Sequence, residues 1–567
     1  MYIDTVPNRK SPPAILLRES WRVGKKTGKR TVANITHWPP EQIEALRRVL
    51  KGDTLVDPQE AFDIELNLPH GHVAAVLGTI KQLQLDRIIA SKRSRQRDLV
   101  VAMIAERLIH PCSKLATTRF WHTTSLAQQL AVEDADEEEL YDTLDWLLAR
   151  QQGIEKRLAA RHLCEGSLVL YDVSSSYYEG HCCPLACPGH DRDNQGGHSI
   201  IVYGVLTDEV GRPVAVEVYP GNTGDPTTVP DQVNKLKDRF GLSRVVLVGD
   251  RGMLTETRIE KLKEYPGVGW ISALRSTAVR KLANEGTLQM SLFDQKDLAE
   301  IRSAEFPGER LVACYNPLLA TQRRRKRQEL LAATEKGLAA IAREVARRTK
   351  KPLQDGEIGQ KVGRVINRFK MAKHFTVNIA DGVFSFARNE ESILREGHLD
   401  GIYVIRTSEP AQRISAEDTV RAYKNLAQVE RAFRTLKGID LLVRPIYHRT
   451  EDHVRAHILL CMLAYYVEWH MRRALAPILF DDEELPQERK TRHPVKPAMA
   501  SASAKSKKLL RRTPDGLEVH SFRTLLAALA TQCRNLCRIT TDPNAPTFYR
   551  LTKPTALQAK AFQLLEL

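Results

Sequence analysis

The sequence lacks a long run of apolar residues. No stretch of about 18 consecutive apolar residues occurs, which is the length a membrane-spanning helix needs. The longest apolar run, from Ile458 to Val467, is followed by Glu468 and His470, a pattern typical of a buried helix. The N-terminal residues contain no apolar segment of the kind found in signal peptides. We therefore expect no membrane partner.

Nucleotide-binding motifs and a regular cysteine framework are also missing. The chain has neither a P-loop nor a Gly-rich dinucleotide fingerprint, so no nucleotide cofactor is expected. Its 9 cysteines are an odd number at irregular spacing, which favours reduced thiols and a cytoplasmic protein. Cys182, Cys183 and Cys187 leave a structural zinc site open, although their spacing matches no common zinc finger. A loop with reduced thiols is the simpler interpretation.

Positive charge is in excess. The chain has 85 Lys and Arg against 69 Asp and Glu, which gives a net charge of +16 and a pI of about 9.4. This charge is spread along all 567 residues rather than gathered in one tail. Such a balance favours a polyanionic partner and fits an extended path for nucleic acid.

Composition and periodicity divide the chain into seven segments. Residues 1–56 predict a β-hairpin with a basic tip, and residues 57–163 have the apolar periodicity of helices. A long basic helix beginning at Thr321 is expected within an insertion. The remaining boundaries separate a catalytic core in two parts, a basic linker and a C-terminal segment. The expected ranges are 1–56, 57–163, 164–274 (core, first part), 275–398 (insertion), 399–480 (core, second part), 481–514 (flexible linker) and 515–567.

Two aspartates occupy corresponding places in the first part of the core. Its pattern predicts the order β-β-β-α-β-α-β, with Asp172 in or at the end of the first strand and Asp250 at the end of the fourth. Acidic residues rarely occur in such apolar runs without a charge partner or a metal. A single aspartate of this kind is more often a turn or cap residue. The occurrence of two favours a metal site.

A third carboxylate lies on a predicted helix from Tyr423 to Lys437. Residues 423, 426, 430, 434 and 437 are spaced 3, 4, 4 and 3 apart and share one face of a helix. Leu426, Val429, Phe433 and Leu436 form an adjoining apolar stripe that is expected to dock on the sheet. Glu430 then points into a cleft beside the cations Arg434 and Lys437. The alternative is an ordinary amphipathic helix with a solvated Glu430–Arg434 pair.

Other candidate groups have weaker patterns. Glu179 and Asp193 are acids near Asp172 that we expect in a surface loop. His453 and His457 have a spacing compatible with metal binding, but no carboxylate partner is evident, which favours packing or hydrogen bonding.

The order Asp172, Asp250, Glu430 resembles the DDE transposases of bacterial insertion sequences. The closest resemblance is to the branch whose glutamate lies in a Tyr-x2-Arg-x3-Glu-x6-Lys motif, here running from Tyr423 to Lys437 with Leu426 in place of the Arg. The segments 171–176, 220–225 and 248–252 add to the likeness. Residues 165–470 carry most of it, and the N-terminal hairpin is similar as well.

The resemblance implies an α/β fold: a ribonuclease H-like mixed sheet with flanking helices, interrupted by an α+β insertion, plus a mainly helical N-terminal DNA-binding region. It implies that Asp172, Asp250 and Glu430 hold two Mg²⁺ ions, for which Mn²⁺ can substitute, about 3.5–4 Å apart. Tyr423, Arg434 and Lys437 are then expected to bind DNA.

The expected activity is binding of terminal inverted repeats, metal-dependent cleavage and strand transfer into target DNA. A homodimer on double-stranded DNA in the bacterial cytoplasm is implied. The alternatives are a DDE-like nuclease or resolvase without strand transfer, and a catalytically inactive DNA-binding protein derived from a transposase.

Overall fold

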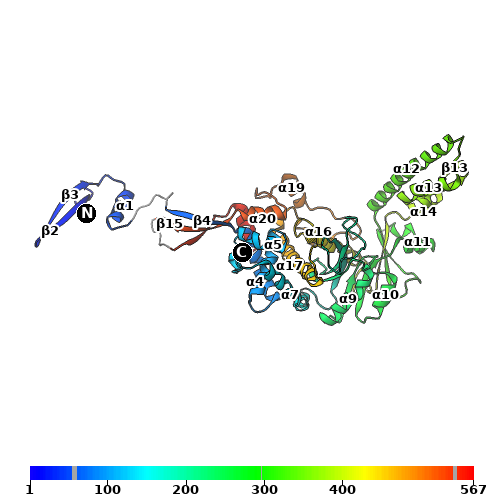
Figure 1. Ribbon diagram of the computed structural model, residues 1–567, viewed down its shortest axis with the longest axis horizontal. Helices are drawn as coiled ribbons and strands as arrows, with labels where there is room; N and C mark the ends of the chain where they lie inside the picture. Colours follow the sequence, from blue (N-terminus) through cyan, green and yellow to red (C-terminus); the bar gives the residue numbers. More distant parts are fainter. Residues whose placement is uncertain (10, 54–60, 295, 541–545) are drawn as a thin grey trace. The chain divides into compact units, whose positions relative to one another are not determined.

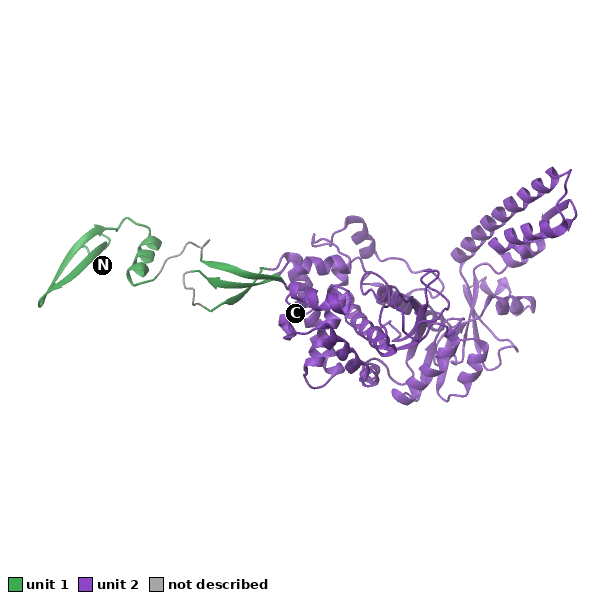
Figure 2. Ribbon diagram, in the orientation of Figure 1, with its two compact units in different colours: residues 1–68, 533–553 green, residues 69–532, 554–567 purple. Residues whose placement is uncertain are grey.

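The computed structural model describes residues 1–9, 11–53, 61–294, 296–540 and 546–567 (Figure 1). The chain forms two compact units (Figure 2). Unit 1 comprises residues 1–68 and 533–553, and unit 2 comprises residues 69–532 and 554–567.

Unit 1 contains two small sheets, of which the first is antiparallel throughout. In the first, β1 (Tyr2–Val6), β2 (Ala14–Val23) and β3 (Lys26–Asn34) pair in sequence order. The predicted hairpin is confirmed, with a tighter turn than expected, in which Gly24 adopts φ +59°. The second sheet has the order β16-β15-β4, so β4 (Phe62–Pro69) pairs with β15 (Cys533–Ile539). The sequence pattern did not predict this pairing, because the two strands are separated by more than four hundred residues.

Unit 2 is built on a mixed sheet of eight strands, in the order β10-β11-β14-β9-β8-β5-β6-β7. The strands β5 (Leu168–Tyr177), β6 (Ile200–Asp208) and β7 (Pro213–Pro220) form an antiparallel meander. On its other side β5 pairs in parallel with β8 (Val245–Val248), which pairs in parallel with β9 (Val268–Ala273). The predicted meander and the two strands after it are all present. Almost every residue of β6 and β8 is buried, which explains their continuous apolar sequences.

Helices cover this sheet. Helix α17 (Glu451–Leu475) packs against β7, α4 (Arg95–Ile109) and α7 (Glu137–Leu148). Its segment Ile458–Val467 is buried along its whole length, as the sequence predicts. In the part of the chain that the structure describes, no helix is long and apolar enough to cross a membrane.

Residues 275–398 are divided between the sheet and a separate core. Strands β10 (Leu298–Ile301) and β11 (Arg310–Tyr315) extend the main sheet through β14 (Ile402–Thr407). The rest of the segment has its own hydrophobic core, to which Leu338, Ile358 and Phe375 belong. Its elements are α12 (Pro317–Arg347), α13 (Asp355–Phe369), β12 (Phe375–Ala380), β13 (Val383–Arg388) and α14 (Glu390–Gly397).

Part of the segment expected as a flexible linker is helical. Ser501 caps α19 (Ala502–Leu510) by accepting a hydrogen bond from the Ala504 N–H. The Lys507 side chain is only 2% exposed, pairs with Glu483 and donates to the Asp481 carbonyl at 2.7 Å. The lysine-rich composition predicted solvent exposure, but the buried Lys507 holds α19 against residues 481–483 through these contacts.

Candidate active site

The register of two parallel strands brings Asp172 and Asp250 together. Leu168 pairs with Val246 and Leu170 with Val248, so paired positions on β5 and β8 differ by 248 − 170 = 78. The two aspartates differ by the same number, 250 − 172 = 78. Neighbouring strands lie about 4.8 Å apart, and equal offsets place side chains on the same face. Asp172 and Asp250 therefore lie side by side where β8 ends.

The backbone holds both aspartates in place. Asp172 lies in the middle of β5 rather than at its end, and its Oδ1 accepts the Val173 N–H at 2.8 Å. Asp250 follows β8 in a turn, where its Oδ1 accepts the N–H groups of Gly252 at 2.9 Å and Met253 at 2.7 Å.

Glu430 comes from helix α16 (Leu426–Lys437), which packs on β5 and β6. The predicted apolar stripe is confirmed, since Leu426, Val429, Phe433 and Leu436 are all buried. The Phe433 ring contacts the Tyr203 ring of β6 edge-on at 5.8 Å. Docking through this stripe leaves Glu430 exposed.

The three carboxylates interact electrostatically. The pKa of Asp172 rises from 3.8 to about 7, chiefly because burial disfavours its charge and also because Asp250 and Glu430 repel it. The Val173 N–H and Arg192 oppose the rise. Burial raises the pKa of Tyr423 to about 12, and all three carboxylates contribute to that shift. Tyr423 thus lies beside the cluster.

The cluster suits divalent cations. Glu430 has no hydrogen bond or ion pair among the described residues, and Arg192 is engaged in a two-oxygen ion pair with Asp225. Negative charge at the cluster is therefore poorly compensated, and carboxylate oxygens are the ligands that Mg²⁺ prefers.

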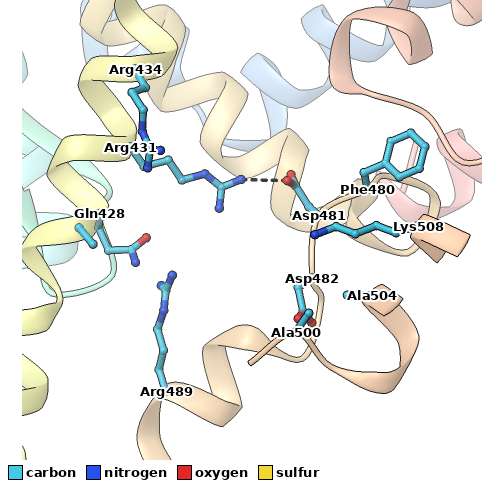
Figure 3. A pocket seen from close by; sticks show the side chains of 11 residues that line it. Gln428, Arg431, Arg434, Phe480, Asp481, Asp482, Arg489, Ala500, Ala504 and Lys508 are labelled. Carbon is cyan, nitrogen blue, oxygen red and sulfur yellow. Dashed lines mark hydrogen bonds and ion pairs between the residues drawn. The ribbon is translucent and has the colours of Figure 1, made fainter. Parts of the chain in front are cut away.

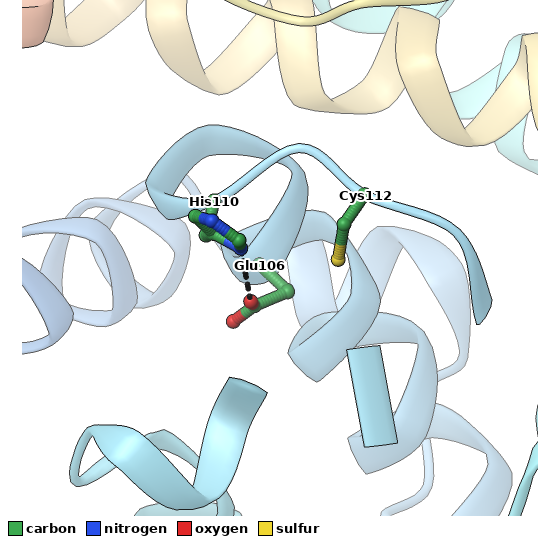
Figure 4. A group of neighbouring side chains, drawn as sticks. All are labelled: Glu106, His110 and Cys112. Carbon is green, nitrogen blue, oxygen red and sulfur yellow. Dashed lines mark ion pairs between the residues drawn. The ribbon is translucent and has the colours of Figure 1, made fainter. Parts of the chain in front are cut away.

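A different group of potential ligands lies in unit 2 near the end of α4. Ligand atoms of Glu106, His110 and Cys112 lie within 4.8 Å of one another (Figure 4). Burial raises the pKa of the Cys112 thiol, and the nearby charges of Arg107 and Lys114 oppose that rise only in part.

The predicted helix Tyr423–Lys437 is two helices. Helix α15 (Ala416–Lys424) ends at Asn425, which also precedes the first residue of α16. Tyr423 therefore belongs to a different helix from Glu430, although both face the carboxylates. The prediction of a single helix was wrong, because the break at Asn425 was missed.

Lys437 is engaged by an acid that we expected on the surface. Its Nζ lies 2.9 Å from Asp193 Oδ1 and also donates to the Ser175 carbonyl. The Asp193 side chain is 1% exposed, pairs also with Arg444 and accepts the Tyr177 N–H at 3.3 Å. Asp193 is therefore a buried link between α16 and the end of β5, and its expected position in a surface loop was wrong.

Arg434 lies on the exposed side of α16 and lines a pocket of about 410 Å³ (Figure 3). Arg431 lines the same pocket and pairs with Asp481 at 3.0 Å. Leu426, at the motif position of an Arg, is buried and contributes no charge.

The remaining candidates have structural partners. Tyr447 donates to Glu179 at 2.7 Å, and the His457 imidazole is 3.2 Å from the Val443 carbonyl. His453 stacks on Tyr141, with ring centroids 4.9 Å apart. The packing interpretation of the two histidines is thus supported.

Comparisons with known proteins agree with this geometry. A family model described as a transposase DDE domain matches residues 187–467, and one described as the N-terminal domain of IS1634 family transposases matches residues 3–60. Together they take in most of the chain. The chain is a DDE transposase, and its N-terminal residues match the IS1634 family. As a DDE transposase it is an enzyme of DNA cleavage and strand transfer, encoded by an insertion sequence.

The DDE match of this transposase contains Asp250 and Glu430 and begins after Asp172. Asp172 lies outside this match, and the strand register described above places it next to Asp250.

Solved transposases show weaker likeness. A piggyBac transposase synaptic complex with hairpin DNA is 10% identical, with a TM-score of 0.32, over 81% of this chain and 76% of that one. A Mos1 transposase paired-end complex is 14% identical, with a TM-score of 0.14, over 43% and 69%. No curated protein matches significantly. The assignment rests on the family matches.

Proposed function

We propose that Asp172, Asp250 and Glu430 are the catalytic residues of this transposase. The observation that carries the proposal is the equal offset of 78 residues in the strand register and between the aspartates. Support comes from the raised pKa of Asp172, which is due chiefly to burial and also to repulsion by Asp250 and Glu430, and from the exposed Glu430, which has no ion pair among the described residues.

Asp172, Asp250 and Glu430 would together hold two Mg²⁺ ions, since their carboxylates influence one another and supply the oxygen ligands that Mg²⁺ prefers. Bound there, the ions supply activation of a water or DNA 3′-hydroxyl nucleophile and stabilisation of the leaving 3′-oxygen. Mn²⁺ would substitute, as an ion that also accepts oxygen ligands.

Neighbouring side chains position these acids and the DNA. Tyr423 would donate a hydrogen bond from its hydroxyl group to a backbone phosphate, because burial and the three carboxylates keep that hydroxyl protonated. Arg434, which is exposed and has no ion pair among the described residues, would contact a phosphate one helical turn from Glu430. Lys437 is held by Asp193, so it would reach a phosphate only after exchanging that partner.

The fold proposed for this core is ribonuclease H-like. The strand order β7-β6-β5-β8-β9 combines a three-stranded meander with two parallel strands beside its first member, which supports the proposal. Membership in the Tyr-x2-Arg-x3-Glu-x6-Lys branch is proposed as well, with Leu426 as a departure. Residues 57–163 are proposed as a DNA-binding region.

The proposed reaction begins with binding of terminal inverted repeats by a homodimer in the bacterial cytoplasm. It continues with cleavage at the ends and strand transfer into target DNA. The net charge of +16 supports a polyanionic substrate.

An in vitro reaction tests this proposal. Purified protein is incubated with labelled duplexes carrying the element's terminal repeats, a target plasmid and Mg²⁺. Joined products are expected from the wild type and none from Asp250→Asn, which should still bind the ends. Cleavage without joined products would favour a nuclease or resolvase. Full activity of Asp250→Asn would overturn the assignment of the site.

A further inference from the structure

A basic pocket lies beside the catalytic helix. The wall formed by α16 carries Arg431 and Arg434, and the opposite wall carries Arg489 of α18 (Leu485–Thr491) and Lys508 of α19. Figure 3 shows Arg489 reaching up toward Gln428 and Arg431 from the helix below. Four cationic side chains from three helices therefore line one cavity of about 410 Å³.

The acids in the pocket are already engaged. Asp481 pairs with Arg431 at 3.0 Å and with Arg472 at 3.5 Å. Asp482 accepts the backbone N–H groups of Ser501 at 2.9 Å and Glu484 at 3.1 Å. Neither acid neutralises the cations of the opposite wall.

Three of the four cations in the pocket have no acidic partner among the described residues. Among the described residues, Arg434, Arg489 and Lys508 have no ion pair or side-chain hydrogen bond. Arg489 is half-buried, and its pKa falls to about 10 because burial and the charges of Arg431, Arg492 and Arg473 disfavour its cation. Like charges that lie close together without a counter-ion repel one another and destabilise the folded protein. A bound anion would relieve this repulsion.

We propose that this pocket binds a backbone phosphate of the DNA held at the catalytic carboxylates. Arg434 lies four residues from Glu430 on α16, which is about 6 Å along the helix axis. A strand cut beside Glu430 therefore passes within reach of the pocket, and guanidinium groups suit phosphate because they donate two parallel hydrogen bonds. The proposal rests on the function proposed above, and it adds Arg489 and Lys508 from a segment that the DDE match does not include.

The chain provides closely matched variants for a test. Arg489→Gln with Lys508→Gln removes two charges from the pocket. Lys490→Gln with Lys505→Gln removes two exposed charges from the same helices outside the pocket lining. The dissociation constant for a duplex carrying the terminal repeat is measured against KCl concentration for both variants and the wild type.

The pocket variant should bind DNA more weakly, and its slope of log affinity against log salt should decrease by about 0.9 for each phosphate that the variant no longer neutralises. The control variant should keep the wild-type slope. Without DNA, the thermal midpoint of Arg489→Gln should equal or exceed that of the wild type, because repulsion is relieved. A role in structure alone would lower it.

Equal slopes for the pocket variant and the wild type would overturn this inference while leaving the catalytic proposal intact. Wild-type protein that binds the duplex with the predicted slope but fails to cleave it would contradict the catalytic proposal alone. Absence of any binding by the wild type would overturn both.

Discussion

Replacement of Asp172 by Asn should inactivate the enzyme and stabilise the metal-free protein. Asp172 is half-buried on β5, where burial disfavours its charge and Asp250 and Glu430 repel it. Asn keeps the size and can accept the same Val173 N–H, but it carries no charge. The substitution therefore removes repulsion without leaving a cavity.

The sign and size of the effect follow from the pKa. In the unfolded chain Asp172 ionises near 3.8, whereas in the folded protein it ionises near about 7. Below the lower value both states are protonated, and the residue has no effect on stability. Between the two values the folded state holds the extra proton, so stability falls as pH rises. Above the upper value the full penalty applies, at most about 4 kcal/mol at ~1.36 kcal/mol per pH unit.

Thermal unfolding in EDTA at pH 5 and pH 8 measures this effect of Asp172 on stability. We expect Asp172→Asn to unfold at a higher temperature than the wild type at pH 8, with a smaller advantage at pH 5. Mg²⁺ should then stabilise the wild type more than the variant. Asp193→Asn is the control, because Asp193 is paired with Lys437 and Arg444, and its removal should lower the midpoint at both pH values. An Asp172→Asn protein that is less stable than the wild type at pH 8 would refute the reasoning.

Three further predictions concern catalysis and packing. Glu430→Gln should lower single-turnover cleavage at least about a thousandfold with end binding retained, and wild-type affinity with normal cleavage would contradict its role. Lys437→Met should lower the free energy of unfolding by about 1–3 kcal/mol in urea titrations, because it leaves the buried Asp193 with one cation. Gly204→Ala should cost about 1–3 kcal/mol by thermal unfolding, since its Cβ would lie 2.4 Å from the Tyr171 hydroxyl oxygen; an unchanged midpoint would show that Tyr171 can move.

The sequence predicted the parts of the site that depend on local pattern. Strand alternation and turn residues placed Asp172 in the first strand of the core and Asp250 at the end of the fourth, and helical spacing placed Glu430 beside an apolar stripe; that these two strands are neighbours came from the structure. Each signal is contained in about a dozen residues. The eight-stranded order was only partly foreseen, because pairing of β11 with β14 joins segments far apart in the chain.

Interactions between distant segments were missed for the same reason. Gln428 lies outside the apolar stripe predicted for its helix, yet it is buried against the turn that contains Gly211. Asp193 was expected at the surface, yet it accepts hydrogen bonds from Lys437 and the Tyr177 N–H. Helical periodicity predicts the one face of a helix that packs on the core. It does not predict contacts that another segment makes with the opposite face.

Diffraction from crystals soaked with Mn²⁺ tests the central claim most directly. Anomalous scattering should show two ions bound by Asp172, Asp250 and Glu430. Crystals of Asp172→Asn should lose at least one of them. Ions bound elsewhere, with none between these three carboxylates, would contradict the account of the active site.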